Sequence, residues 1–157
     1  MVRVKNAADY PQFIEIVAQW HWTAWGHADL EDSLERWTAS LRSRTNRDRV
    51  PMTFIAIDDS DSPVGSVALV AHDMPDRTDL THLSPWVAGT FVICSKRGKG
   101  IGKMLMRHAV EEADRVGARE LFLYTSTARP FYERLGWTLV REDFYEGEPV
   151  AIMARRS

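Results

Sequence analysis

Three glycines lie within residues 98–102, between an apolar segment and an amphipathic one. The apolar segment, residues 86–93, is typical of a strand in the middle of a sheet. Residues 100–116 carry apolar side chains at helical spacing, and residues 120–124 form a second strand pattern. The run predicts two parallel strands joined by a right-handed helical crossover.

The remaining patterns predict one α+β domain over residues 1–157. Helical spacing predicts a helix over residues 7–25 and another that is capped by Asp29 or Asp32 and runs through Leu41. A short helix over residues 128–135 is expected, with Thr127 as its cap. Strands are expected at residues 2–5, 52–57, 64–71, 137–140 and 149–153. The expected fold is a mixed sheet of about six to seven strands with flanking helices and a central β-α-β unit.

Composition excludes several classes of protein. The chain is 45% hydrophobic and 27% charged, with a net charge of −2, so a broad basic surface for nucleic acid is not expected. One cysteine cannot form an internal disulfide and fits a reducing compartment. Neither a membrane-spanning apolar run nor the apolar region of a signal peptide is found. We expect a soluble cytoplasmic domain that binds neither nucleic acid nor membranes.

The glycine-rich turn has the chemistry of an anion site. A glycine-rich connection from strand to helix exposes backbone N–H groups at the positive end of the helix dipole. Arg97, Lys99 and Lys103 add positive charge. Phosphate or pyrophosphate is therefore the expected ligand.

Spacing distinguishes between the known phosphate loops. A Walker A loop needs glycine at position 97 and Ser or Thr at position 104, where this chain has Arg97 and Met104. The dinucleotide fingerprint that fits Gly98 and Gly100 needs a third glycine at position 103, which is lysine. A nucleotide-phosphate enzyme is thus a weak alternative, which ATP binding without coenzyme A binding would restore.

The spacing that does fit is Arg-x-x-Gly-x-Gly, over residues 97–102. It resembles the acetyl-CoA pyrophosphate loop of the GNAT superfamily of N-acetyltransferases. Residues 128–137, Ala-Arg-Pro-Phe-Tyr-Glu-Arg-Leu-Gly-Trp, resemble the second signature of that family. The resemblance implies a GNAT-like fold and acetyl-CoA as co-substrate.

The resemblance also implies roles for individual residues. The pantetheine arm would pair with the strand backbone at Thr90, Phe91 and Val92, and the pyrophosphate would bind the turn. The turn residues are Arg97, Gly98, Lys99, Gly100, Ile101, Gly102 and Lys103. Tyr132 is the expected general acid that protonates the departing thiolate, because thiol and phenol pKa values are close. A packing role beside Phe131 is the alternative for Tyr132.

The chain departs from the family pattern at two places. Thr125 stands where many members have an asparagine, so its pantetheine contact is open. The central strand has no carboxylate that would act as a general base. Weak candidates for that base lie after residue 71: His72, Asp73, Asp79 and His82. No close pair has metal-ligand spacing, so no metal site is expected.

The sequence says less about the site for the acceptor amine. Four tryptophans crowd the first two helices, and most of them are expected in the core rather than in a pocket: Trp20, Trp22, Trp25 and Trp37. The basic segment 42–49 is expected to be a solvated helix end rather than a guide for an acidic acceptor. Cys94 is expected to be a small packing residue.

These expectations converge on an N-acetyltransferase that moves acetyl from acetyl-CoA directly to a primary amine, without a covalent enzyme intermediate. The amine is a protein N-terminus, a lysine or a small molecule, and a homodimer is possible. The alternative is a GNAT-fold module that binds CoA or acyl-CoA without catalysis.

Overall fold

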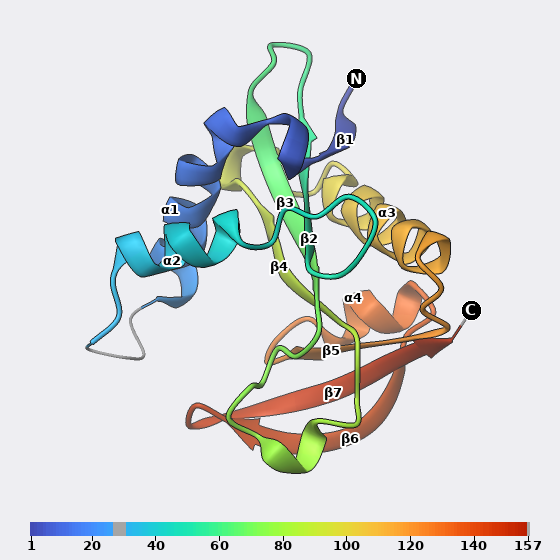
Figure 1. Cartoon of the computed structure of the whole chain (residues 1–157). Coiled ribbons are helices and arrows are strands. Elements are labelled where there is room, and N and C mark those ends of the chain that lie inside the picture. Colours follow the sequence, from blue (N-terminus) through green and yellow to red (C-terminus); the bar gives the residue numbers. More distant parts are fainter. Residues whose placement is uncertain (27–30, 157) are drawn as a thin grey trace.

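A computed structural model of the chain describes residues 1–26 and 31–156, which form one seven-stranded mixed sheet with four α-helices (Figure 1). The sheet has the order β1-β2-β3-β4-β5-β7-β6. Its strands are β1 (Arg3–Asn6), β2 (Met52–Ile57), β3 (Pro63–Val70), β4 (Trp86–Val92), β5 (Glu120–Thr125), β6 (Thr138–Tyr145) and β7 (Glu148–Arg156). The helices are α1 (Ile14–Trp25), α2 (Leu34–Arg42), α3 (Ile101–Arg115) and α4 (Arg129–Arg134). The predicted α+β mixed sheet is confirmed.

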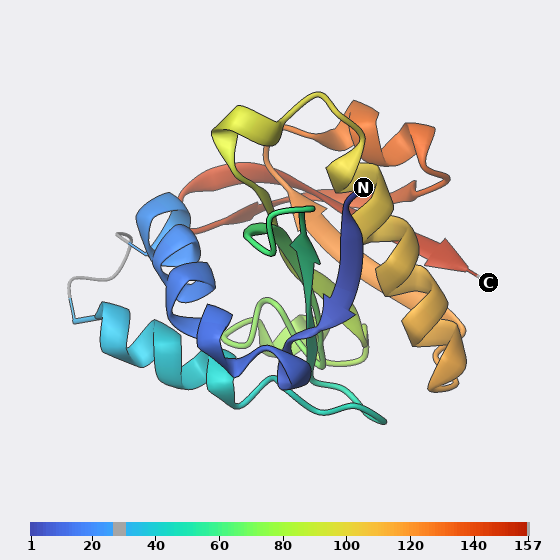
Figure 2. The ribbon, with the colours of Figure 1, turned by 90° about the horizontal axis from the view of Figure 1, so that it is seen from above.

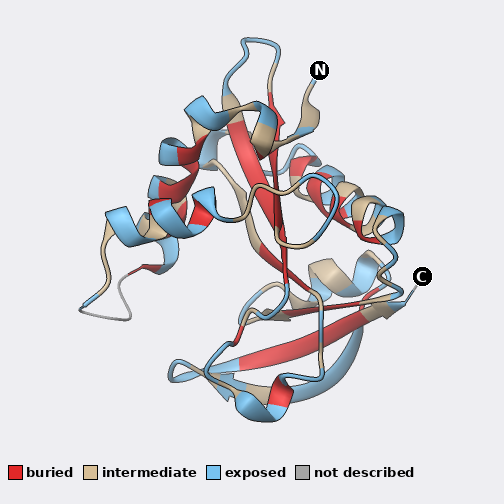
Figure 3. Cartoon of the chain, in the orientation of Figure 1, coloured by how far each residue is buried: buried red, intermediate tan, exposed pale blue. Residues whose placement is uncertain are grey.

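Helices cover both faces of the sheet. Figure 2 shows α1 and α2 on one side of the strands and α3 on the other. The strand β2 is buried along its whole length (Figure 3), because alternate side chains face the two helical layers. Phe54 packs in the cluster that contains α3, whereas Ile55 packs with α1 and α2. A third apolar cluster joins side chains of β3, β4, β5 and β7 with the loop before β4, so the described residues form three apolar clusters.

The strands β4 and β5 are parallel and separate soon after they meet. They share one register pair, Trp86 with Phe122. On its other side β4 pairs with β3 as far as Val92, and β5 pairs with β7 as far as Thr125. Pairing with β3 thus keeps β4 in the sheet, and pairing with β7 keeps β5 in it. The edges of β4 and β5 that face each other diverge. The helix α3 connects the two strands, as the predicted crossover requires.

A β-bulge interrupts β4 where the two strands diverge. Ser66 of β3 pairs with Phe91, and Ala68 pairs with Ala88, so one residue of β3 lies opposite both Gly89 and Thr90. Gly89 has φ +60°, a left-handed conformation that favours glycine.

The first two helices begin later than the sequence predicts. Residues 7–13 form two 3₁₀ turns, Ala7–Asp9 and Pro11–Phe13, before α1 begins at Ile14. The cap of α2 is Ser33, whose hydroxyl accepts a hydrogen bond from the N–H of Arg36. The expected cap Asp32 instead accepts from the N–H of Ser33 and from Trp37 Nε1. The other expected cap, Asp29, lies outside the described residues.

The final hairpin is longer than the sequence predicts. The strands β6 and β7 extend beyond the predicted ends at residues 140 and 149, up to a turn in which Glu146 and Gly147 have positive φ. The edge strand β6 is mostly exposed, so it lacks the apolar alternation that identifies a half-buried strand.

Candidate active site

The glycine-rich turn leaves β4 through a 3₁₀ turn, Cys94–Lys96, and leads into α3 (Figure 2). Gly98 has φ +76° and Gly100, the N-cap residue of α3, has φ +83°. Apart from each glycine, its two chain neighbours and the adjoining helix backbone, no heavy atom of the described residues lies within 4 Å of where a Cβ would stand at either glycine. Open space therefore lies beside backbone N–H groups at the positive end of a 15-residue helix, an arrangement that suits an anion.

Side chains of the turn have different surroundings. Arg97 folds back on β4, where its Nε donates a hydrogen bond of 2.9 Å to the carbonyl of Val92. Lys99 and Lys103 are exposed, whereas Ile101 is buried in the core on the α3 face. Only the backbone of Ile101 is therefore available to a ligand. A Cβ on Gly102 would lie 3.6 Å from Phe131, so this glycine lies where α3 approaches α4.

The helix α4 brings Tyr132 to the bulged part of β4. Burial raises the pKa of Tyr132, and hydrogen bonding with the Thr90 side chain opposes that shift. The phenol is therefore protonated at neutral pH, as a proton donor must be. Tyr132 also packs against the core beside Phe131 and Leu135, although the sequence pattern places it off that face. The structure thus brings together Tyr132 and Thr90, two of the predicted site residues.

Thr125 holds the turn between β5 and α4. Its hydroxyl accepts a hydrogen bond of 3.0 Å from the N–H of Ala128. The N-cap residue of α4 is Ala128 and no side chain of the described residues caps this helix, so the predicted cap Thr127 is wrong. Thr125 also lines a cavity of about 400 Å³ between β5, α4 and the final hairpin. The other lining residues are Ser126, Arg129, Glu142, Asp143, Phe144, Pro149, Val150 and Ala151.

Of the four candidate bases, Asp73 has the surroundings that suit a base. Burial raises its pKa to about 7, against the opposing charge of Arg44. Asp79 is held by Arg77 and Arg141, and hydrogen bonding to Arg77 lowers its pKa to about 2. His72 and His82 are exposed. Asp73 is half-buried, and its charge contributes to the raised pKa of Tyr124 on β5.

His21, which is not among the predicted site residues, is the buried polar residue of α1. Only 7% of it is exposed, and its Nε2 lies 2.8 Å from the hydroxyl of Ser66. Burial lowers the pKa of His21 to about 4, so the ring is neutral at physiological pH. Its place at helical spacing on the inner face of α1 was the available sequence signal. Its partner lies 45 residues away, which the sequence does not reveal.

The structure corrects the expected burial of the tryptophans and of the cysteine. Trp20, Trp22 and Trp37 are half-buried, and 44% of Trp25 is exposed, because Val17, Ala18 and His21 occupy the inner face of α1. Cys94 is exposed rather than packed. In the basic segment 42–49, Arg42 pairs with Glu15 and Arg47 pairs with Asp9, which supports its expected role as a solvated helix end.

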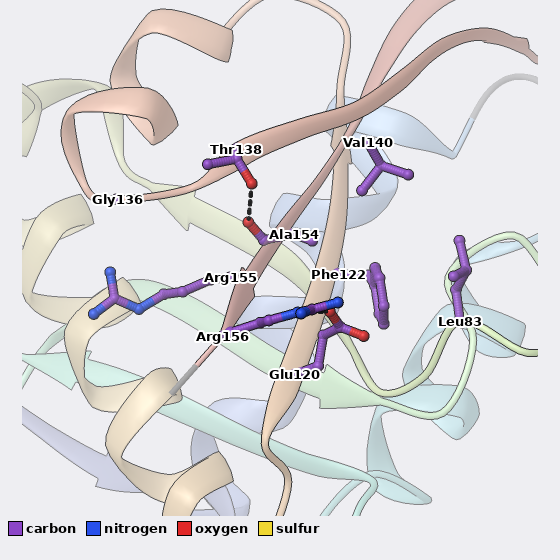
Figure 4. Close-up of a pocket in the computed structure, with 9 residues that line it drawn as sticks. All are labelled: Leu83, Glu120, Phe122, Gly136, Thr138, Val140, Ala154, Arg155 and Arg156. Carbon is purple, nitrogen blue, oxygen red and sulfur yellow. Dashed lines mark hydrogen bonds and ion pairs between the residues drawn. The ribbon is translucent and has the colours of Figure 1, made fainter.

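A cavity of about 600 Å³ lies away from the predicted site (Figure 4). It is formed by the start of β5, β6 and the end of β7, and by Leu83 from the loop before β4. No predicted acetyl-CoA residue lines it. Within residues 1–26 and 31–156, no group of three or more metal-ligating side chains gathers, and no helix is long and apolar enough to cross a membrane.

Known proteins share both the sequence pattern and the fold of this chain. The sequence model described as the acetyltransferase (GNAT) family matches residues 14–137. No curated protein matches the chain. An aminoglycoside 6'-N-acetyltransferase complexed with coenzyme A is similar in structure, with a TM-score of 0.76 at 15% identity, over 98% of this chain and 96% of the other.

Two further solved structures show the same fold. A GNAT-family acetyltransferase from Streptococcus pneumoniae has a TM-score of 0.69 at 18% identity, over 99% of both chains. An IAA acetyltransferase from Bacillus cereus ATCC 14579 has a TM-score of 0.66 at 20% identity, over the whole of both chains.

Proposed function

Because the chain belongs to the GNAT family of acetyltransferases, we propose that it transfers an acetyl group from acetyl-CoA directly to a primary amine. The observation that carries this proposal is the meeting of three features at one edge of β4. These features are the open glycine turn at the N-terminus of α3, the divergence of β4 from β5, and the protonated phenol of Tyr132.

The chain has groups that suit each part of acetyl-CoA. The N–H groups of residues 98–103 would hold the pyrophosphate, since the space beside Gly98 and Gly100 is open. The edge of β4 that has left β5 offers backbone groups to the amides of the pantetheine arm. Thr90, Phe91 and Val92 lie on this part of β4. Thr125 accepts one hydrogen bond from Ala128, so its hydroxyl proton and its second lone pair remain for a contact with the arm.

Tyr132 is the proposed general acid. A C–N bond forms between the amine and the acetyl carbon, and the C–S bond of the thioester breaks. The phenol gives its proton to the departing sulfur and regains one from solvent or from the ammonium product. Binding of both substrates in one site supplies proximity, so no covalent enzyme intermediate is needed.

Asp73 is the proposed base that takes a proton from the acceptor ammonium. Its pKa of about 7 lies close to neutral pH, where a base is both ionised and able to accept a proton. The acceptor is a primary amine of a protein or of a small molecule.

The test is calorimetric titration with acetyl-CoA, with ATP and NAD as controls, followed by thiol release across a panel of amines. We expect acetyl-CoA alone to bind, and at least one amine to accelerate thiol release. Absence of acetyl-CoA binding by folded protein would refute the proposal. Tight binding with no thiol release for any amine would favour the CoA-binding module.

A further inference from the structure

A chain of three polar groups crosses from α1 to the bulge of β4. The hydroxyl of Ser66 lies 2.8 Å from His21 Nε2 and 2.9 Å from the carbonyl oxygen of Gly89. Ser66 is fully buried and His21 nearly so. Buried polar groups of this kind are costly unless each one is satisfied, so the arrangement is tightly specified.

Proton counting fixes the direction of both hydrogen bonds. A carbonyl oxygen only accepts, so the single hydroxyl proton of Ser66 goes to Gly89. Toward the imidazole the Ser66 oxygen is therefore the acceptor, and His21 Nε2 must carry a proton and donate it. Because the pKa of His21 is lowered by burial, the ring is the neutral Nε2–H tautomer.

The same contacts orient the next peptide group. In a trans peptide the C=O and the N–H point in opposite directions. The Gly89 carbonyl points to Ser66 of β3, so the N–H of Thr90 points away from β3, toward the edge where β4 has parted from β5. Van der Waals contact with His21 also limits the residue at position 89, since a Cβ on Gly89 would lie 3.1 Å from His21 Cε1.

We propose that His21 is a positioning residue for acetyl transfer: through Ser66 it holds the Gly89–Thr90 peptide so that the Thr90 N–H faces the thioester carbonyl. This inference rests on the proposed function. An N–H fixed in advance toward an oxygen on which negative charge develops stabilises the transition state more than a mobile one. His21 and Ser66 touch no reacting atom, so they act through the peptide alone.

Four variants separate positioning from packing. Ser66→Ala removes the hydrogen bond to Gly89, and His21→Met removes the donor while it fills the space. His21→Gln keeps an N–H donor at the position of Nε2. Thr53→Val is the matched control, because it removes a buried hydroxyl of β2 that has no hydrogen-bond partner within the described part of the chain.

The first measurement is the ¹⁵N spectrum of the ligand-free protein, which reports the tautomer of His21. The second is the Thr90 amide resonance with acetyl-CoA compared with CoA, which needs no acceptor amine. We expect the Nε2–H tautomer, and a downfield shift of the Thr90 amide proton with acetyl-CoA but not with CoA. That shift should persist in His21→Gln and Thr53→Val, and shrink in Ser66→Ala and His21→Met.

Kinetics with an active amine complete the test. Ser66→Ala and His21→Met should lower kcat by about 10- to 100-fold, while KM for acetyl-CoA changes less than about twofold. The Nδ1–H tautomer, or a Thr90 shift that is the same in Ser66→Ala as in the unaltered protein, would overturn this inference and leave the proposed function intact. Failure of the unaltered protein to bind acetyl-CoA would overturn both.

Discussion

The guanidinium carbon of Arg97 lies 5.5 Å from the centre of the Phe91 ring, and Arg97 Nε donates to the carbonyl of Val92. Phe91 in turn stacks on Trp20 of α1 at 5.6 Å. The Arg97 side chain therefore links the turn to β4, and through Phe91 to α1. The link depends on the planar guanidinium and its Nε as well as on the positive charge. Lysine reproduces the charge but neither the planar stacking nor the hydrogen bond from Nε.

We therefore expect Arg97→Lys to lose most of the acetyl-CoA affinity that Arg97→Ala loses, about five- to tenfold. Titration calorimetry at low and at high salt measures this loss. A loss that disappears in Arg97→Lys would show that only the charge of Arg97 matters.

Gly100→Val should weaken acetyl-CoA binding more than tenfold, because φ +83° is unfavourable for valine and the new side chain fills the space beside the turn. Lys99→Ala should lower the affinity for acetyl-CoA by about threefold at low salt, since it removes one screened surface charge. The control is Gly117→Val, at φ +89° with nothing within 4 Å, beyond the other end of α3. It should lower stability similarly without changing affinity. Equal losses of affinity in the two valine variants would contradict an anion site at the turn.

Tyr132→Phe should lower kcat by about 10²-fold or more at saturating substrates and leave the Kd of acetyl-CoA nearly unchanged. The substitution keeps the ring that packs beside Phe131 and Trp137 and removes only the proton donor. Tyr10→Phe is a suitable control, because Tyr10 stacks on Phe13 near the N-terminus. An unchanged turnover number would exclude Tyr132 as the acid.

Asp73→Asn should remove a rise in kcat/KM that the unaltered protein shows as pH increases through about 7. The carboxylate is the basic form, so activity grows as Asp73 loses its proton. A pH profile of the variant that keeps this rise would assign the base elsewhere. Asp79→Asn is the control, because the ion-paired Asp79 is already ionised at these pH values.

The same shift predicts an effect on stability. The pKa of Asp73 is higher in the folded state than in an unfolded chain, so the folded state holds the proton more tightly and stability falls as pH rises from about 4 to 7. The difference in melting temperature between Asp73→Asn and the unaltered protein should therefore favour the variant more at pH 8 than at pH 4.

The features that the sequence predicts correctly are local. The strand, turn and helix around Gly100 follow from residue types that are adjacent in the chain, because glycine conformations, helix periodicity and buried strands each leave a short-range pattern. The sequence does not predict the extent of β6, since an exposed edge strand has no apolar face. It also does not predict where α1 starts, because Pro11 begins a separate 3₁₀ turn.

The relations that the sequence could not reveal join distant segments. His21, Ser66 and Gly89 come from α1, β3 and β4, and nothing in their own surroundings in sequence indicates that they meet. The burial of His21 in place of Trp20 depends on how α1 lies over the sheet. Tertiary contact, rather than periodicity, decides which of two neighbouring helical positions points inward.

The parting of β4 and β5 places a free strand edge in the middle of the sheet. Free edges normally occur at the rim, where they are open to pairing with other protein chains and favour aggregation. An edge flanked by strands on both sides is shielded from such partners, yet it keeps the hydrogen-bonding groups that pair with an amide. Only a ligand about as narrow as a single extended chain can therefore enter between β4 and β5 and form hydrogen bonds with this edge.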